Sequence, residues 1–249
     1  MSGHSKWHSI KHKKAVVDAR RGQHFTKLAR AITVAAREGG GDPEGNPGLA
    51  LAIQKARDAS MPKDNIERAI AKGTGEGIDT DQIETVLYEG YGPGGVALLV
   101  EALTDNRNRT GADVRHALSK QGGNLGEPGS VSYLFDKRGV LVVDAGRYDE
   151  EDLMAAIDAG AEDISLDEDV YEIITAPSDL VPVREALQQA GVELESADVT
   201  QRPKSRVPVD EADATKLMKL IDALEESDDV SAVHANFDVD AAVLERIAS

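Results

Sequence analysis

Apolar residues recur at intervals of three and four along the first 75 residues, the spacing of helices that bury one face. The first stretch predicts a helix from Phe25 to the glycines at 39–41, where glycine relieves a left-handed cap. A second helix is predicted to begin after Asn46, whose side chain can cap it, with Pro47 in its first turn. A third covers residues 62–72. The pattern therefore predicts a small three-helix domain.

The hydrophobic period changes from helical to strand-like at residue 84, after a linker at 73–80 that is rich in glycine and threonine. Two strands joined by a Gly-Pro-Gly-Gly turn are predicted, followed by a helix and a further strand. These elements cover residues 85–89, 96–103, 110–121 and 131–135. A mixed α/β domain therefore follows the helices.

Between residues 139 and 200 the predicted elements follow the order strand, helix, strand, strand, helix, strand, which is typical of a ferredoxin-like unit. They cover residues 140–143, 150–159, 163–166, 170–175, 178–190 and 192–200. A helix at 210–225 and a strand at 230–237 follow, and they would complete the sheet that begins before this unit. The ferredoxin-like unit is therefore expected to be inserted in the middle domain.

The predicted fold class is thus α+β, with an N-terminal three-helix domain followed by two α/β domains, the last of them ferredoxin-like. The expected domains are a basic helical domain with an N-terminal arm (1–78), a discontinuous middle domain (79–137 plus 204–249) and the ferredoxin-like domain (138–203).

The net charge of -17 conceals an asymmetry between the two ends of the chain. Residues 1–75 carry 14 Lys or Arg against 7 Asp or Glu, a balance of +7, whereas the remainder carries 14 against 38, a balance of -24. A basic end can pair with phosphates and release counterions, while an acidic body repels a polyanion. We therefore expect nucleic acid to contact a limited surface, and the acidic part to be merely solvated.

The first 24 positions contain many basic residues and the only tryptophan of the chain. We interpret residues 2–24 as an N-terminal arm. Basic segments of this kind often order on RNA, whereas the alternative is a solvated tail. The predicted nucleic-acid-binding residues, including two arginines of a later loop, are Lys6, Trp7, His8, Lys11, His12, Lys13, Lys14, Arg20, Arg21, Lys27, Arg107 and Arg109.

The loop at 105–110, between a predicted strand and a predicted helix, admits two interpretations. Arg107 and Arg109 beside free helix amides would form an anion site. Alternatively the loop is a helix cap in which one of these arginines pairs with Asp105 or Asp113.

The sequence gives little support for a dinucleotide-binding, metal or catalytic site. The glycines at 90–95 match G-x-G-x-x-G, but a strand follows them and Pro93 removes an amide, so they predict a hairpin turn. His4, His8 and His12 could share a helical face, but the surrounding lysines disfavour a metal. The two remaining histidines, His116 and His234, are interpreted as partly buried structural residues. We expect no enzyme activity, metal, cofactor or small-molecule substrate.

The location is inferred from two absences. The sequence has no cysteine, which fits a reducing compartment. Its longest unbroken apolar run is far shorter than the roughly 20 residues of a membrane span. We therefore expect a cytoplasmic protein with no membrane partner.

Several motifs resemble the YebC/PmpR family along the whole chain. They stand at residues 3–7, 11–15, 18–22, 39–43, 88–95, 105–110 and 122–126. The resemblance implies a three-domain protein with a helical N-terminal domain and no established catalytic residues. It also implies one of two activities, because members are described as DNA-binding transcriptional regulators, while relatives that include a mitochondrial translational activator are tied to the ribosome.

Two functions therefore remain open from the sequence. A DNA-binding regulator fits the basic helical domain, although no convincing recognition helix is visible and the turn between the second and third helices only loosely resembles helix-turn-helix. A ribosome-associated translation factor that contacts rRNA or tRNA is slightly favoured, because an arm of Lys, His and Trp suits irregular RNA.

Overall fold

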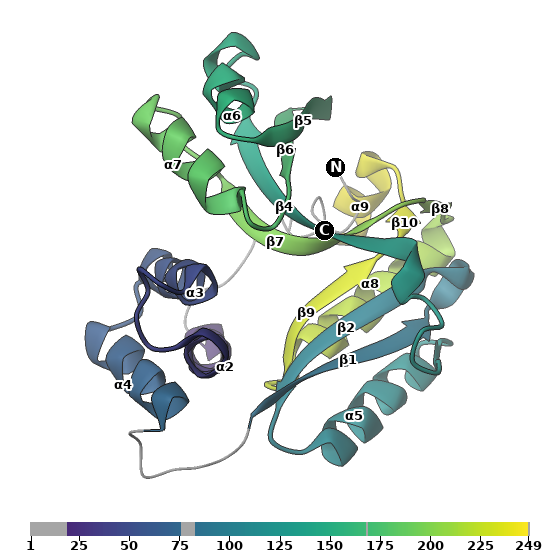
Figure 1. The fold of residues 1–249 in the computed structure, drawn as a ribbon. Coiled ribbons are helices and arrows are strands. Elements are labelled where there is room, and N and C mark those ends of the chain that lie inside the picture. The colour runs from purple at the N-terminus through teal and green to yellow at the C-terminus, as the bar shows by residue number, and fades with distance from the viewer. Residues whose placement is uncertain (1–18, 76–82, 168, 249) are drawn as a thin grey trace. The chain divides into compact units, whose positions relative to one another are not determined.

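The structure is a computed structural model that describes residues 19–75, 83–167 and 169–248. Contacts divide these residues into two compact units, one of residues 135–204 and one that combines those before 135 with those after 204. N-terminal helices precede two sheet-containing regions (Figure 1). The α+β fold class expected from the sequence is therefore confirmed, while the domain boundaries stay a prediction.

Three helices, here called the head (residues 19–75), open the described chain. They are α2 (Ala19–Gly39), α3 (Pro47–Asp58) and α4 (Lys63–Thr74). Asn46 caps α3 by accepting a hydrogen bond from the amide of Leu49 at 3.1 Å. Gly40, just after α2, has a φ of 88°, the left-handed conformation that glycine adopts without strain. The head core includes Ile32, Leu49 and Ile53.

A four-stranded antiparallel sheet follows in the same unit, with strands in the order β3-β1-β2-β9. Its strands are β1 (Glu84–Tyr91), β2 (Ala97–Thr104), β3 (Asn124–Leu125) and β9 (Val230–Ala235), and its helices are α5 (Arg107–Lys120), α8 (Glu211–Glu225) and α9 (Ala241–Ala248). The predicted glycine hairpin is the 3-10 turn η1 (Pro93–Gly95) between β1 and β2. A two-stranded parallel pair, β8 (Val207–Pro208) with β10 (Phe237–Asp238), completes this part.

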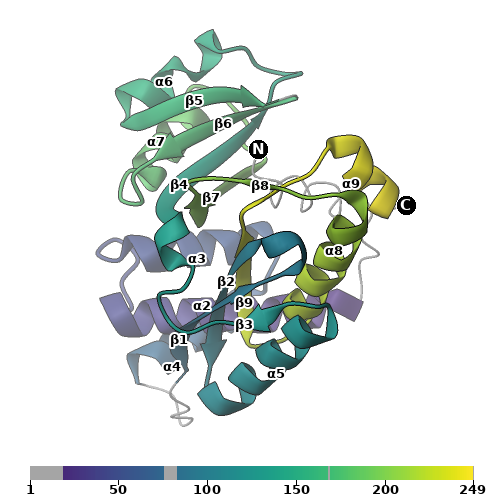
Figure 2. The same ribbon diagram turned by 90° about the vertical axis from the view of Figure 1, so that its right-hand side faces the viewer.

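Both faces of this sheet are covered, which explains the continuous apolar run of β2. Leu98 and Val100 pack with α5 and α8 in one core. On the other face Leu103 packs with Val34 of α2 and with Ile83. Figures 1 and 2 show the sheet between α2 on one side and α5 with α8 on the other. The head is therefore attached to the sheet through α2.

The unit of residues 135–204 has the βαββαβ order expected from the sequence. Its elements are β4 (Phe135–Asp144), η3 (Glu151–Leu153) running into α6 (Met154–Asp158), β5 (Ala161–Asp167), β6 (Val170–Thr175), α7 (Leu180–Gln189) and β7 (Ser196–Pro203). The strand order β5-β6-β4-β7, with antiparallel neighbours throughout, is that of a ferredoxin-like sheet.

The structure corrects two expectations. The first helix begins at Ala19, not at Phe25, so the last residues assigned to the arm are helical. The strand expected at 131–135 is wrong, because η2 (Ser132–Leu134) is a 3-10 turn that leads into β4. The carboxylate of Glu89 shapes this turn by accepting backbone hydrogen bonds from Val131 and Ser132 at 2.7 and 2.8 Å. A contact so distant in sequence leaves no local pattern.

Candidate nucleic-acid interface

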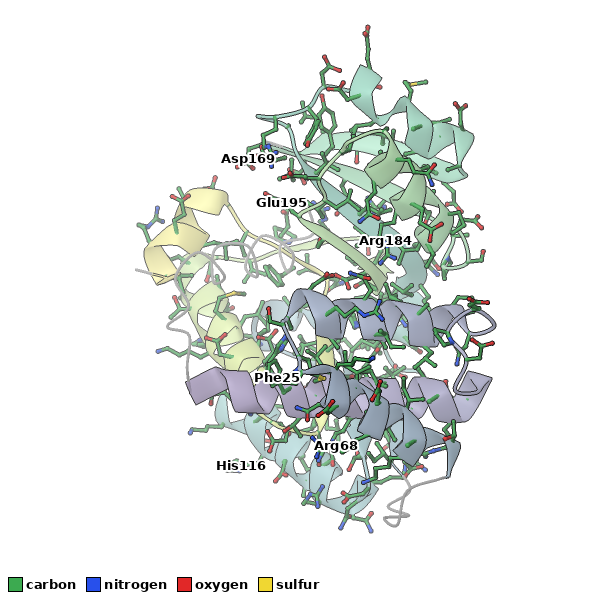
Figure 3. The ribbon with its side chains drawn as sticks, turned by 90° about the vertical axis from the view of Figure 1, so that its left-hand side faces the viewer. Phe25, Arg68, His116, Asp169, Arg184 and Glu195 are labelled. Atoms are coloured by element: carbon green, nitrogen blue, oxygen red, sulfur yellow. The ribbon has the colours of Figure 1, made fainter. Side chains whose placement is uncertain are left out.

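The cations of α3 and α4 lie mostly at the surface of the head. Arg57, Lys63 and Arg68 are exposed, and Figure 3 labels Arg68 on α4. Lys63 forms only a loose ion pair with Glu67, at 3.4 Å on the same helix. Such an exposed pair contributes little to stability and leaves the charge accessible to a polyanion. These two helices therefore offer positive charge to the solvent.

Two cations of α2, Lys27 and Arg30, are instead engaged with the sheet domain. Lys27 donates to the carbonyl of Glu225, and Arg30 donates to the carbonyl of Asp228 at 2.9 Å. Gln23, one turn before Lys27, donates to the carbonyl of Glu226. The last carbonyls of a helix lack partners within the helix and carry the negative end of its dipole, so cations stabilise them. The face of α2 that carries these three side chains thus caps the C-terminal end of α8 and the turn after it.

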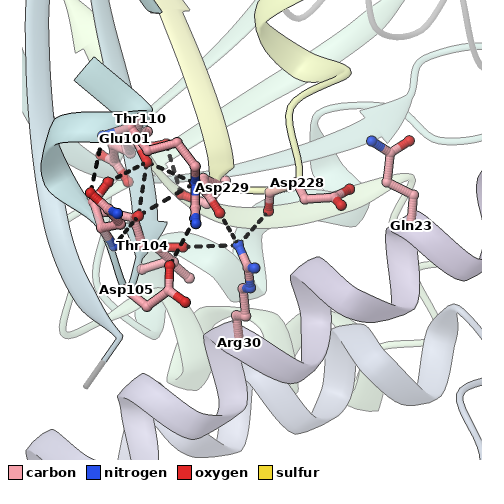
Figure 4. A network of polar contacts seen from close by, with 12 residues as sticks. Gln23, Arg30, Glu101, Thr104, Asp105, Thr110, Asp228 and Asp229 are labelled. Atoms are coloured by element: carbon pink, nitrogen blue, oxygen red, sulfur yellow. Dashed lines mark hydrogen bonds and ion pairs between the residues drawn. The ribbon is translucent and has the colours of Figure 1, made fainter. Parts of the chain in front are cut away.

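A buried carboxylate, Asp229, connects the head to the sheet (Figure 4). Its side chain is only 8% exposed, and its Oδ1 accepts from Arg30 Nη1 at 2.5 Å. Its Oδ2 lies 2.8 Å from Arg109 Nη2 and 2.7 Å from the hydroxyl of Thr110. A buried charge is tolerated when it is paired and hydrogen-bonded in this way. We call Asp229, Arg30, Arg109 and Thr110 the Asp229 cluster.

Two opposing effects act on the pKa of Asp229. Burial disfavours the charged form and would raise the pKa, but the hydrogen bonds from Arg109, Thr110 and Arg30 outweigh it. The pKa of Asp229 falls from 3.8 to about 2 as a result. The hydrogen bonds from Arg109 to Asp229 and to Asp105 raise the pKa of Arg109. Asp229 and Arg109 are therefore both charged at neutral pH.

The loop at 105–110 makes the contacts of a capped helix start. Asn106 accepts from the amide of Arg109 at 3.1 Å as the N-cap of α5. The guanidinium of Arg109 pairs with Asp105 at 2.7 Å as well as with Asp229, as the second interpretation of the loop expected. Arg107 pairs with Glu84 at 3.3 Å instead of an aspartate of the loop. Nucleic-acid binding by Arg107 and Arg109 stays a prediction.

The remaining predicted binding residues divide into three groups. The group that lies outside the described part of the chain is Lys6, Trp7, His8, Lys11, His12, Lys13 and Lys14, and His4 lies there too. Arg20 and Arg21 lie in the first turn of α2, and only their backbone is described. Lys27 is half-buried against the end of α8. The structure brings Arg109 into the Asp229 cluster and places Lys27 on the same face of α2 as Arg30.

Sequence reasoning missed Arg30 and Asp229, and it was wrong about one histidine. Arg30 and Asp229 are 199 residues apart, so no local motif joins them. The only signal in the sequence was an arginine within the largely apolar stretch of residues 28–36. His116 is exposed rather than partly buried, whereas His234 is buried, with its Nε2 3.4 Å from Glu101.

Comparison with known proteins gives matches along the chain. A family described as "TACO1/YebC protein N-terminal domain" matches residues 5–76, and one described as "TACO1/YebC second and third domain" matches residues 83–237.

None of the helices in the described part of the chain combines the length and hydropathy of a membrane span.

Similar proteins cover the whole length of the chain. A "probable transcriptional regulatory protein" of Rubrobacter xylanophilus is 56% identical over 249 residues, with 100% of both chains covered. A protein of Persephonella marina with the same description is 56% identical, with 99% of this chain and 100% of that one covered. The crystal structure of a conserved hypothetical protein from Aquifex aeolicus matches with a TM-score of 0.82 and 54% identity, over 92% of this chain and 95% of that chain.

Proposed function

This chain belongs to the TACO1/YebC family, and from that premise we propose that it regulates gene expression by binding nucleic acid through its basic N-terminal part. Relatives that match it over its full length are described as probable transcriptional regulatory proteins, which agrees with a regulatory role. The proposal gives the chain no catalysed reaction, cofactor or metal.

The division of charge along the chain is the observation that carries the proposal. The first 75 residues have a balance of +7, and the rest of the chain has -24. A phosphate backbone gains free energy from pairing with clustered cations, because the condensed counterions are released. The acidic remainder would repel the same polyanion and so direct it to the basic end.

The contacts of the head are consistent with such a role. The cations of α2 at Lys27 and Arg30 are engaged with the end of α8 and with Asp229, so they hold the head against the sheet. The exposed cations of α3 and α4 stay accessible to phosphates. We propose that they, together with the lysines at 11, 13 and 14, form the contact surface, while the Asp229 cluster fixes its position.

Irregular RNA, as found on the ribosome, is the partner that we propose first. The basic N-terminal segment contains Trp7 and several histidines, whose rings can stack on unpaired bases. DNA is a second candidate because α3 and α4 are joined by a tight turn, in which Ser60 has a φ of 59°. That turn is compatible with helix-turn-helix recognition.

Sedimentation of a cell lysate on sucrose gradients at low and high salt tests this function. We expect the chain to migrate with ribosomes at low salt and to leave them at high salt, because pairing with phosphates weakens as salt rises. Migration with free protein at both salt concentrations would contradict the ribosomal role. Selective binding to promoter fragments would then identify DNA as the partner.

A further inference from the structure

A pocket of about 440 Å³ lies between α2 and α4 and reaches the start of β1. Its apolar wall includes Phe25 of α2, Met61 in the turn before α4, and Ile83. Met61 and Ile83 are almost fully buried, whereas the ring of Phe25 is partly exposed. A volume of this size lies within the range of pockets that take small organic ligands.

The cations of the pocket come mainly from α4. Arg68 and Lys72 line it, and Arg30 contributes from α2. Asp105 is the one carboxylate among the described residues of the lining, and it is paired with Arg109. Arg30 is already paired with Asp229. The exposed Arg68 donates to the side chain of Asn65 and to the carbonyl of Asp64, which leaves other N–H donors of its guanidinium open to a ligand. Arg68 is therefore a cation of the pocket that an anionic group can reach from solvent.

The hydroxyl groups and helices around the pocket are held firmly in place. The buried hydroxyl of Thr33 is shared between the carbonyls of Ala29 and Ala69, at 2.9 and 3.1 Å. Beside it, α2 and α4 are in direct contact, because a Cβ on Gly73 would come within 2.4 Å of the carbonyl oxygen of Thr33. The part of the pocket wall that α2 and α4 form is therefore a preformed feature of the head.

We propose that this pocket binds one unpaired nucleotide of a single-stranded nucleic acid, with its base against Phe25 and Met61 and its phosphate on Arg68. The inference rests on the proposed function and deepens it, because it names the form of nucleic acid that the head takes. An aromatic ring beside a cation is the combination that single-strand binding uses, since every base has a face that stacks and every nucleotide a phosphate. Figure 3 shows Phe25 and Arg68 on the head helices that form the pocket.

A duplex cannot present a base to such a pocket without unpairing it, which costs a few kcal/mol. Binding through the pocket therefore selects a single strand over a duplex of the same length. The pocket chemistry is shared by RNA and DNA single strands, so an RNA oligonucleotide and its DNA counterpart are both used as probes.

The test compares the full-length chain with the variants Phe25→Leu and Arg68→Gln in fluorescence anisotropy. Phe25→Leu keeps an apolar side chain but removes the stacking ring, and Arg68 is exposed, so its replacement should leave folding intact. We expect Phe25→Leu to weaken binding of a labelled 12-nucleotide RNA by about tenfold, in the lower part of the range for losing one stacked base. Arg68→Gln should weaken it by about tenfold as well, as expected for losing one hydrogen bond to a charged group. Binding to a duplex should change by less than about twofold in Phe25→Leu, since the duplex does not enter the pocket. In Arg68→Gln it should fall no more than in Lys63→Gln, since each variant removes one exposed cation of α4.

The matched control is Lys63→Gln, which removes an exposed cation of α4 that does not line the pocket. If the pocket variants and Lys63→Gln have the same affinity for the single strand, the pocket proposal is overturned. The proposed nucleic-acid function would not be affected by that result. A wild-type chain that binds none of the probes would overturn both. Equal losses with the RNA and DNA strands would assign the contact to base and phosphate, while a loss confined to RNA would assign it also to the ribose.

Discussion

Asp229 shows how a single buried residue can hold a helical domain against a sheet domain. Its carboxylate accepts from arginines on two different elements, Arg30 of α2 and Arg109 of α5, and from the hydroxyl of Thr110. Removing one partner of such a buried group leaves the others without compensation, which is costly. The orientation of the head relative to the sheet to which α2 is attached therefore depends on this residue.

The variant Asp229→Asn should lower the free energy of unfolding by about 2 kcal/mol at pH 7. A carboxylate whose pKa is lowered on folding, here from 3.8 to about 2, stabilises the folded state at pH values above 3.8. That contribution disappears as the pH falls from about 4 to about 2, so the difference between wild type and variant should shrink over this range. Urea unfolding of wild type and variant at several pH values measures this difference.

Asp105→Asn is the control for this prediction. Asp105 also pairs with Arg109, but its side chain is 38% exposed against 8% for Asp229. The decrease in the free energy of unfolding should be under about 1 kcal/mol, as is usual for exposed ion pairs. Equal decreases for the two variants would show that the buried position of Asp229 has no special role.

At the scale of elements, the helices of the head depend on close packing as well as on capping. Gly73 lies inside α4, where glycine is normally unfavourable. A Cβ at this position would lie 2.4 Å from the carbonyl oxygen of Thr33 and 2.7 Å from the Cβ of Ala36, both in α2. Glycine here permits the contact that forms one end of the pocket.

We predict that Gly73→Ala destabilises the chain by about 1–3 kcal/mol, because α2 and α4 must separate to admit the methyl group. Gly22→Ala is the matched control, since Gly22 also lies in a helix and a Cβ there meets nothing within 4 Å. That change should be neutral or stabilising by up to about 1 kcal/mol. Thermal unfolding of both variants compares them, and a larger destabilisation by Gly22→Ala would contradict the packing argument.

The elements that the sequence predicts well are those with local determinants. The start of α3 follows from Asn46 and Pro47, and the hairpin before β2 follows from its glycines. Elements set by distant contacts were not predictable, because their partners lie far along the chain. The turn at 132–134 depends on Glu89, whose carboxylate accepts hydrogen bonds from three backbone amides. Burial would raise the pKa of Glu89, but these hydrogen bonds hold it below its usual value.

The candidate site follows the same division between local and distant determinants. The basic character of the first 75 residues is a property of composition and is visible in the sequence. The inward engagement of Lys27 and Arg30 is not visible, because their acceptors lie about 200 residues away in and after α8. Sequence alone therefore identifies a basic domain. It does not distinguish the cations that attach this domain to the sheet from the cations that face solvent.

At the scale of the whole molecule, opposite charges are separated along the chain between a basic beginning and an acidic remainder. Such a distribution favours binding at one end and disfavours wrapping of nucleic acid around the protein. Nucleic-acid binding is therefore expected to rest on few phosphate contacts, made mainly by the N-terminal lysines and the outward cations of α3 and α4.

The salt dependence of RNA binding tests this central claim most directly. Each cation that pairs with a phosphate adds about 0.7 to the steepness of log K against log salt on a single strand, so replacing Lys11, Lys13 and Lys14 with Glu should make the slope shallower by about 2. The control replaces the exposed Lys120, Lys137 and Lys219 of the acidic part with Glu and should leave the slope unchanged. Equal slopes for wild type and the N-terminal variant would contradict the account.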